Sequence, residues 1–133
     1  MSADSWTLVV DLGRPTTTNK AHNMHHRAVS KDRKQWREAG CLLARAGKLP
    51  KLDRIHVEAW GRYPDRRSLP DPDGVAPALK GVLDGLVDAG VVADDSGEFV
   101  ASVTYRTPVV EAGALPALVV VVRAASAAGE GEA

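Results

Sequence analysis

The 133-residue sequence has almost no cysteine, the residue that stabilises small extracellular domains through disulfides, and it lacks the long apolar runs that form membrane-spanning helices. It has one cysteine, Cys41, so no internal disulfide can form and a reducing compartment is expected. No N-terminal apolar run resembles a signal peptide, and no stretch approaches the ~18 apolar residues that a membrane-spanning helix needs. We therefore expect a cytoplasmic protein without a membrane partner.

Aromatic residues are also scarce, with three Trp, two Tyr and one Phe. The core must consist mostly of Val, Leu and Ala. The length predicts one domain, whose poor surface-to-volume ratio would make oligomerisation favourable.

The formal net charge is zero, but the charges are divided unevenly along the chain. Residues 1–67 carry 14 Lys and Arg against 7 Asp and Glu, whereas residues 68–133 carry 3 against 10. One interpretation is a basic face for phosphates and an acidic region for a metal ion. The other is uneven scatter without function, and composition does not decide between them.

The apolar patterns predict strands and helices in alternation. Strands are expected at 5–12, 52–62, 98–110 and 117–123, and helices from an N-cap at Ser30 to Gly47 and from Gly74 or Pro77 to Gly90. A polar loop is expected between the first strand and first helix; its three histidines fit no zinc pattern. The order predicts an α+β single domain over residues 1–123, with a mixed sheet of about four strands and two main helices packed on it. Residues 124–133 are expected to form a disordered tail.

The stretch from Arg66 to Asp95 concentrates the residues capable of chemistry. Asp71 and Asp73 lie two residues apart before the second helix, and Asp94 and Asp95 follow its end. Two carboxylates ~4 Å apart repel by ~4 kcal/mol at an effective dielectric of 20, so three converging aspartates would need a cation or protonation. Oxygen ligands without cysteine favour Mg²⁺. The alternative is a plain turn with an N-cap aspartate.

Lys80 is the one basic residue between Arg67 and Arg106. On the predicted helix its ammonium group leans back toward Asp73, where it could meet a phosphate or stabilise a leaving oxygen. The alternative is an ordinary i, i+4 ion pair with Asp84.

These residues resemble the RusA family of Holliday junction resolvases, which are endodeoxyribonucleases of bacteria and their phages. The matching residues, in order, are Arg66-Arg67, Asp71-Pro72-Asp73-Gly74, Lys80, Asp84-Gly85-Leu86, Ala89-Gly90 and Asp94-Asp95. Pro15 to Asn19 resembles a further segment of the family, and the resemblance covers roughly residues 5–123.

The resemblance implies a Mg²⁺-dependent homodimer that cuts opposite strands of a four-way DNA junction during recombination and repair. It implies catalytic, metal-binding roles for Asp71, Asp73 and Asp95, and a catalytic role for Lys80. The residues expected to contact DNA are Arg14, Asn19, Lys20, Arg66 and Arg67.

The sequence departs from the family pattern at Gly74, which stands where the family has asparagine. Three additional residues separate Asp73 from Lys80, and Pro70 and Pro72 stiffen the acidic loop. A DNA-binding protein of the same fold that has lost catalysis therefore stays an alternative. A small metal- or nucleotide-binding domain is a third hypothesis, against which the basic N-terminal half argues.

Overall fold

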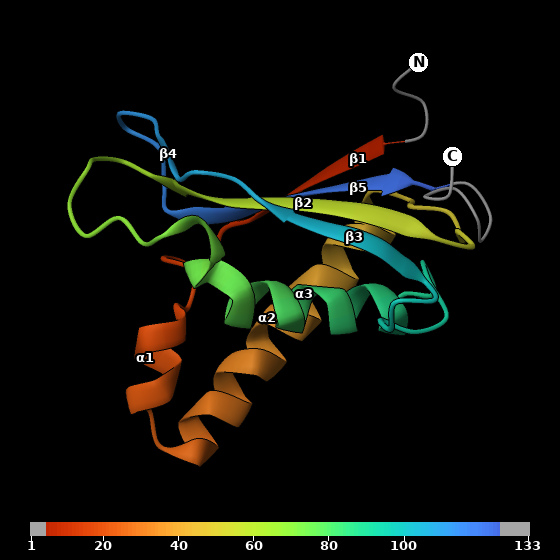
Figure 1. The fold of residues 1–133 in the computed structure, drawn as a ribbon, viewed down its shortest axis with the longest axis horizontal. Helices are drawn as coiled ribbons and strands as arrows, with labels where there is room; N and C mark the ends of the chain where they lie inside the picture. The colour runs from red at the N-terminus through yellow and green to blue at the C-terminus, as the bar shows by residue number, and fades with distance from the viewer. Residues whose placement is uncertain (1–4, 126–133) are drawn as a thin grey trace.

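A mixed sheet with helices on one face organises the chain in the computed structural model, which describes residues 5–125 (Figure 1). The elements are β1 (Ser5–Val10), α1 (Thr18–Asn23), α2 (His26–Ala46), β2 (Ile55–Tyr63), the 3₁₀ helix η2 (Pro72–Val75), α3 (Ala76–Asp88), β3 (Val100–Tyr105), β4 (Val109–Val110) and β5 (Ala117–Ala124). The α+β fold predicted from the sequence, with two main helices on a mixed sheet, is confirmed.

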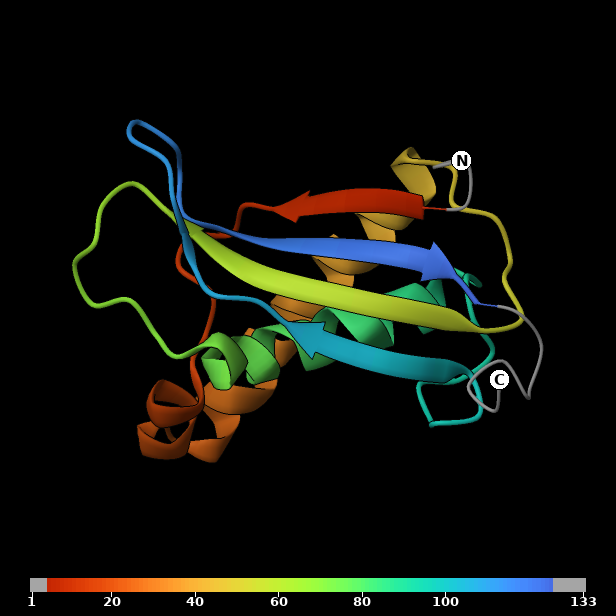
Figure 2. The same cartoon turned by 45° about the horizontal axis from the view of Figure 1, so that its top comes forward.

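The strand order is β1-β5-β2-β3, with the short β4 paired to the end of β2 (Figure 2). β5 runs antiparallel to both of its neighbours, whereas β2 and β3 are parallel. The four consecutive valines lie on β5, between β1 and β2. Val120 and Val122 are completely buried, and Val119 is nearly so. Val121 is partly buried, so the run lies inside the sheet with three of its four valines buried.

The core lies between the sheet and the pair α2 and α3. Alternate residues of β2, Ile55, Val57 and Ala59, point into it, as the sequence alternation predicts. On α3, Leu79, Val82 and Leu86 form the facing apolar stripe and are fully buried.

The two main helices cross at very short range because glycines line their contact. A Cβ atom on Gly85 would lie 2.2 Å from the carbonyl oxygen of Arg37, and one on Gly81 would lie 2.7 Å from Cβ of Trp36. Both distances are shorter than atoms tolerate, so α3 needs glycine at these positions to rest on α2. The polar side chains beside the crossing are thereby brought together.

The prediction of a polar loop between residues 13 and 30 is wrong in part. It contains α1, capped by the Thr17 hydroxyl, and the first turn of α2, which begins after His25 rather than Ser30. None of the α1 residues is buried, so no apolar period marks the helix in the sequence. Asp32, which lies within α2, accepts a hydrogen bond from the hydroxyl of Thr16.

Other element boundaries differ by a few residues. The single strand expected over 98–110 is divided into β3 and β4. Gly90 follows the end of α3 with φ of +80°, as its prediction as a helix stop requires. Ala124 belongs to β5, and the rest of the predicted tail from 126 lies outside the described residues. None of the described helices is long and apolar enough to span a membrane.

Candidate functional site

The loop between β2 and α3 carries Asp71 and Asp73 on its last segment, where Asp71 is the N-cap of η2 and Asp73 lies within it. Pro72 starts η2, and the backbone N–H of Gly74 donates to the carbonyl oxygen of Asp71 at 2.9 Å. A Cβ atom on Gly74 would lie 3.0 Å from Cβ of Pro70. Gly74 therefore fits closely against Pro70, which a larger residue would have to displace.

Both aspartates line an open pocket of about 450 Å³, which we call the acidic pocket. Its lining residues come from two distant parts of the chain: Thr17, Thr18, Asn19, Ser68, Leu69, Pro70, Asp71, Asp73 and Gly74. The negative charge of Asp73, after the larger effect of burial, raises the pKa of Tyr105 at the end of β3. The acidic pocket thus lies where the start of α1 approaches η2 and the loop before it.

Lys80 lies on α3 and pairs with two other aspartates. Its ammonium group donates to Asp95 and lies 3.4 Å from Asp84. We call these three residues the Lys80 cluster. The hydrogen bond from Lys80 lowers the pKa of Asp95, and the same bond raises the pKa of Lys80. Lys80 therefore stays protonated at neutral pH and can offer positive charge or a proton, but cannot accept one.

The three aspartates predicted to bind metal are not brought together. Among residues 5–125, no three His, Cys, Asp or Glu side chains gather in a group that could hold a metal ion. Asp71 and Asp73 share the acidic pocket, whereas Asp95 does not line it and pairs with Lys80. Metal binding by Asp95 stays a prediction that would require its release from Lys80.

The donors of the acidic pocket nevertheless suit Mg²⁺ without Asp95. Asp71 and Asp73 supply two carboxylates, and Asn19 supplies a carboxamide oxygen. Mg²⁺ is usually held by one or two carboxylates, with waters and substrate phosphates completing its octahedron. The pocket therefore fits an ion that a substrate helps to bind.

The residues expected to contact DNA occupy different environments. Arg14 donates to the carbonyl oxygen of Ser68 at 2.7 Å and stacks on Tyr63, with its guanidinium carbon 4.6 Å from the ring centroid. It therefore ties the 64–71 loop to the sheet. Lys20 and Arg66 are exposed, and Arg67 is exposed but pairs with Asp65 at 3.1 Å. Asn19 lines the acidic pocket.

The ion pair that joins the two main helices was not foreseen from the sequence. Arg37 on α2 holds Asp88 on α3 through two hydrogen bonds, the longer of 2.7 Å, which together raise the pKa of Arg37 and lower that of Asp88. The two residues are far apart in the chain and carry no shared motif. Only the glycines on α3, spaced four residues apart, hint that α2 comes close.

A scan against known protein families finds no match, and a search of curated proteins finds none either. The resemblance to RusA resolvases therefore rests on the residues quoted above, and the function that it implies stays a prediction.

Proposed function

We propose that the protein is a Mg²⁺-dependent endodeoxyribonuclease that resolves four-way junctions in cytoplasmic DNA recombination and repair, acting as a homodimer. The observation that carries the proposal is the acidic pocket. It unites Asn19 with Asp71 and Asp73, so two segments of the RusA-like pattern, distant in sequence, meet at one place. An oxygen-rich pocket on a domain with a basic N-terminal half suits a metal ion and a phosphodiester.

Each group would have a separate task. Mg²⁺ held by Asp71 and Asp73 would neutralise charge on the phosphate and favour attack by water. Lys80, protonated because of its aspartate partners, would place positive charge beside a phosphate. Asp84 and Asp95 would hold the lysine side chain in place through their ion pairs. Lys20, Arg66 and Arg67, all exposed, would contact the DNA backbone.

A second candidate is a protein of the same fold that binds branched DNA without cutting it. The pairing of Asp95 with Lys80 favours this candidate, because it removes one expected ligand from the acidic pocket. The glycine at position 74 points the same way, since it cannot orient an aspartate as asparagine could.

Cleavage of a labelled synthetic four-way junction in Mg²⁺ separates the two candidates. We expect the wild type to cut the junction in preference to a linear duplex of equal length, and Asp73→Asn to bind it without cutting. The matched control is Asp53→Asn, which removes an exposed carboxylate outside the acidic pocket and the Lys80 cluster. Binding by the wild type without cleavage would leave the second candidate; absence of both would refute each.

A further inference from the structure

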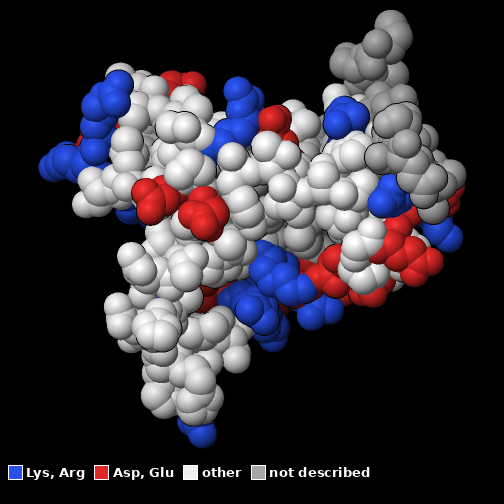
Figure 3. Space-filling view, in the orientation of Figure 1, with Lys and Arg blue, Asp and Glu red and all other residues white. Residues whose placement is uncertain are grey.

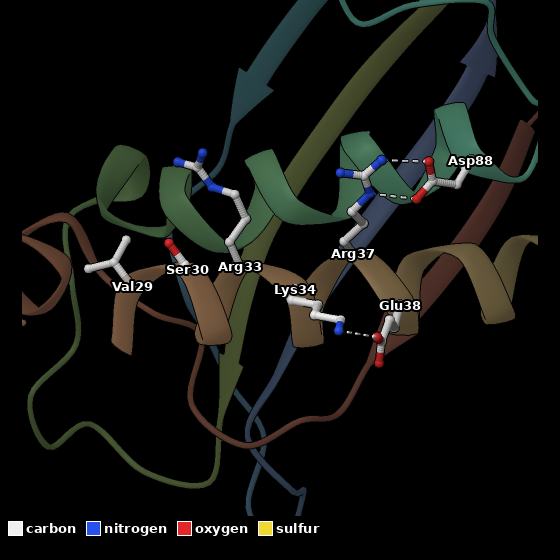
Figure 4. Close-up of a pocket in the computed structure, with 7 residues that line it drawn as sticks. All are labelled: Val29, Ser30, Arg33, Lys34, Arg37, Glu38 and Asp88. Carbon is white, nitrogen blue, oxygen red and sulfur yellow. Dashed lines mark hydrogen bonds and ion pairs between the residues drawn. The ribbon is translucent and has the colours of Figure 1, made fainter. Parts of the chain in front are cut away.

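A second pocket lies along the contact between α2 and α3, and at about 550 Å³ it is larger than the acidic pocket. We call it the basic pocket. Its lining residues are Val29, Ser30, Arg33, Lys34, Arg37, Glu38 and Asp88, all but the last from α2 (Figure 4). Three of these side chains are cationic and two are anionic, so the lining carries one positive charge in excess.

The two acids of the basic pocket are already engaged. Asp88 accepts both hydrogen bonds of Arg37, and Glu38 lies 3.9 Å from Lys34 on the side of α2 away from α3 (Figure 4). The Arg37–Asp88 pair fixes one wall of the pocket. Neither acid is left to neutralise the remaining cation.

Arg33 is that remaining cation. Its side chain extends from α2 toward α3, and within residues 5–125 it makes no hydrogen bond or ion pair (Figure 4). The hydroxyl of Ser30 lies one turn before it on the same pocket. A free guanidinium fork beside a hydroxyl suits a phosphate group, to which arginine donates two parallel hydrogen bonds.

The basic pocket adjoins the Lys80 cluster through Asp84. On α3, Asp84 lies one turn before Asp88, which lines the basic pocket, and Asp84 also pairs with Lys80. Lys and Arg side chains gather over α2 and α3 in the space-filling view, with acidic side chains beside them (Figure 3). The cations of the two helices therefore form one surface.

We infer that Arg33 binds a backbone phosphate of the DNA strand that passes the Lys80 cluster. The inference rests on the proposed function and adds to it a contact on α2. A polyanion suits the site better than a small phosphate. Each exposed cation that contacts DNA, such as Arg33, releases counterions from the DNA, so the affinity rises with the number of contacts.

Equilibrium binding of the labelled junction in EDTA tests the inference without cleavage. Arg33→Ala should weaken binding about tenfold at low salt and reduce the slope of log K against log salt by about 1. The control is Lys31→Ala, which removes the same charge from an exposed position of α2 outside the pocket and should change the affinity less than about twofold. Arg33→Lys should keep the salt slope and recover part of the affinity, since charge is retained without the fork.

The outcomes separate the inference from the proposed function. Equal affinities of Arg33→Ala and Lys31→Ala would overturn the inference, even if the wild type cuts junctions. A selective loss in Arg33→Ala with no cleavage by the wild type would uphold the contact and refute the nuclease. A wild type that does not bind DNA would overturn both.

Discussion

The acidic pocket and the Lys80 cluster each contain two aspartates, but their electrostatic states differ. Asp84 and Asp95 are partly buried and share the ammonium group of Lys80. Asp71 and Asp73 are exposed, and within residues 5–125 no basic side chain pairs with either. One acidic pair thus carries its own cation, whereas the other does not.

This difference indicates where an added cation would bind. A metal ion at the Lys80 cluster would have to displace a bound ammonium group, or share its carboxylates with it. At the acidic pocket the ion would meet two carboxylates with which no basic side chain among residues 5–125 pairs. We therefore expect the acidic pocket to bind the metal and the Lys80 cluster to supply fixed positive charge.

The largest expected effect comes from removing one carboxylate of the acidic pocket. Asp71→Asn should slow junction cleavage about 100-fold, equivalent to about 2.7 kcal/mol of barrier. It should also abolish the Mg²⁺-dependent rise in melting temperature, which reflects about 1.4 kcal/mol when Mg²⁺ is tenfold above its dissociation constant. Cleavage assays and thermal melting with and without Mg²⁺ measure the two effects.

Asp84→Asn is the matched variant in the Lys80 cluster. It should keep the Mg²⁺-dependent rise in melting temperature, because Asp84 does not line the acidic pocket. If Asp84→Asn loses the rise and Asp71→Asn keeps it, the metal binds at the Lys80 cluster and the comparison is reversed.

A smaller effect should follow from separating α3 from α2. Gly85→Ala places a methyl group 2.2 Å from the carbonyl oxygen of Arg37, so we expect a loss of about 1–3 kcal/mol in unfolding free energy. Urea denaturation measures this loss. The Mg²⁺-dependent rise should survive, because Asp71 and Asp73 precede α3.

Gly97→Ala provides the control for this substitution. A Cβ atom there would meet no atom within 4 Å, and the residue does not have positive φ. It should therefore leave the unfolding free energy nearly unchanged. Equal stability of the two variants would show that α2 and α3 do not need the close approach.

The sequence predicted those parts of the fold that bury an apolar face. Contact with the core explains two patterns in the sequence. These are the alternation of Ile55, Val57 and Ala59 and the helical spacing of Leu79, Val82 and Leu86. None of the residues of α1 is fully buried, so no such pattern marks this helix and the sequence predicts a loop there. Apolar periodicity in a sequence arises when one face of an element is buried, so an exposed helix does not show it.

The candidate site was predictable where it depends on local spacing. The Lys80–Asp84 pair follows from an i, i+4 relation on a helix. The pair of Lys80 with Asp95 requires the chain to turn back after Gly90, and Arg37–Asp88 requires the crossing of two helices. Sequence spacing does not encode either contact. The resemblance placed Asp95 with Asp71 and Asp73, but the structure separates them.

The smallest expected effect concerns the pH dependence of stability. The bond from Lys80 holds the pKa of Asp95 below its ordinary value of 3.8. The pair therefore stabilises the fold above that pH, and the contribution is lost as the pH falls through the lower pKa of the folded state. The pKa of Lys80 is raised above 10.5, so stability is also lost as the pH rises past that raised value.

Lys80→Met should remove both pH dependences, which melting temperatures recorded from pH 2 to 12 would reveal. The amplitude should stay below about 1 kcal/mol, because the lysine side chain is 45% exposed and solvent screens the pair. Lys34→Met is the control, since its pair with Glu38 is open to solvent and the two groups lie 3.9 Å apart. If the melting temperature falls at acid and at alkaline pH in Lys80→Met as it does in the wild type, Lys80 does not neutralise its aspartates in solution. The Lys80 cluster would then be as open to an added cation as the acidic pocket.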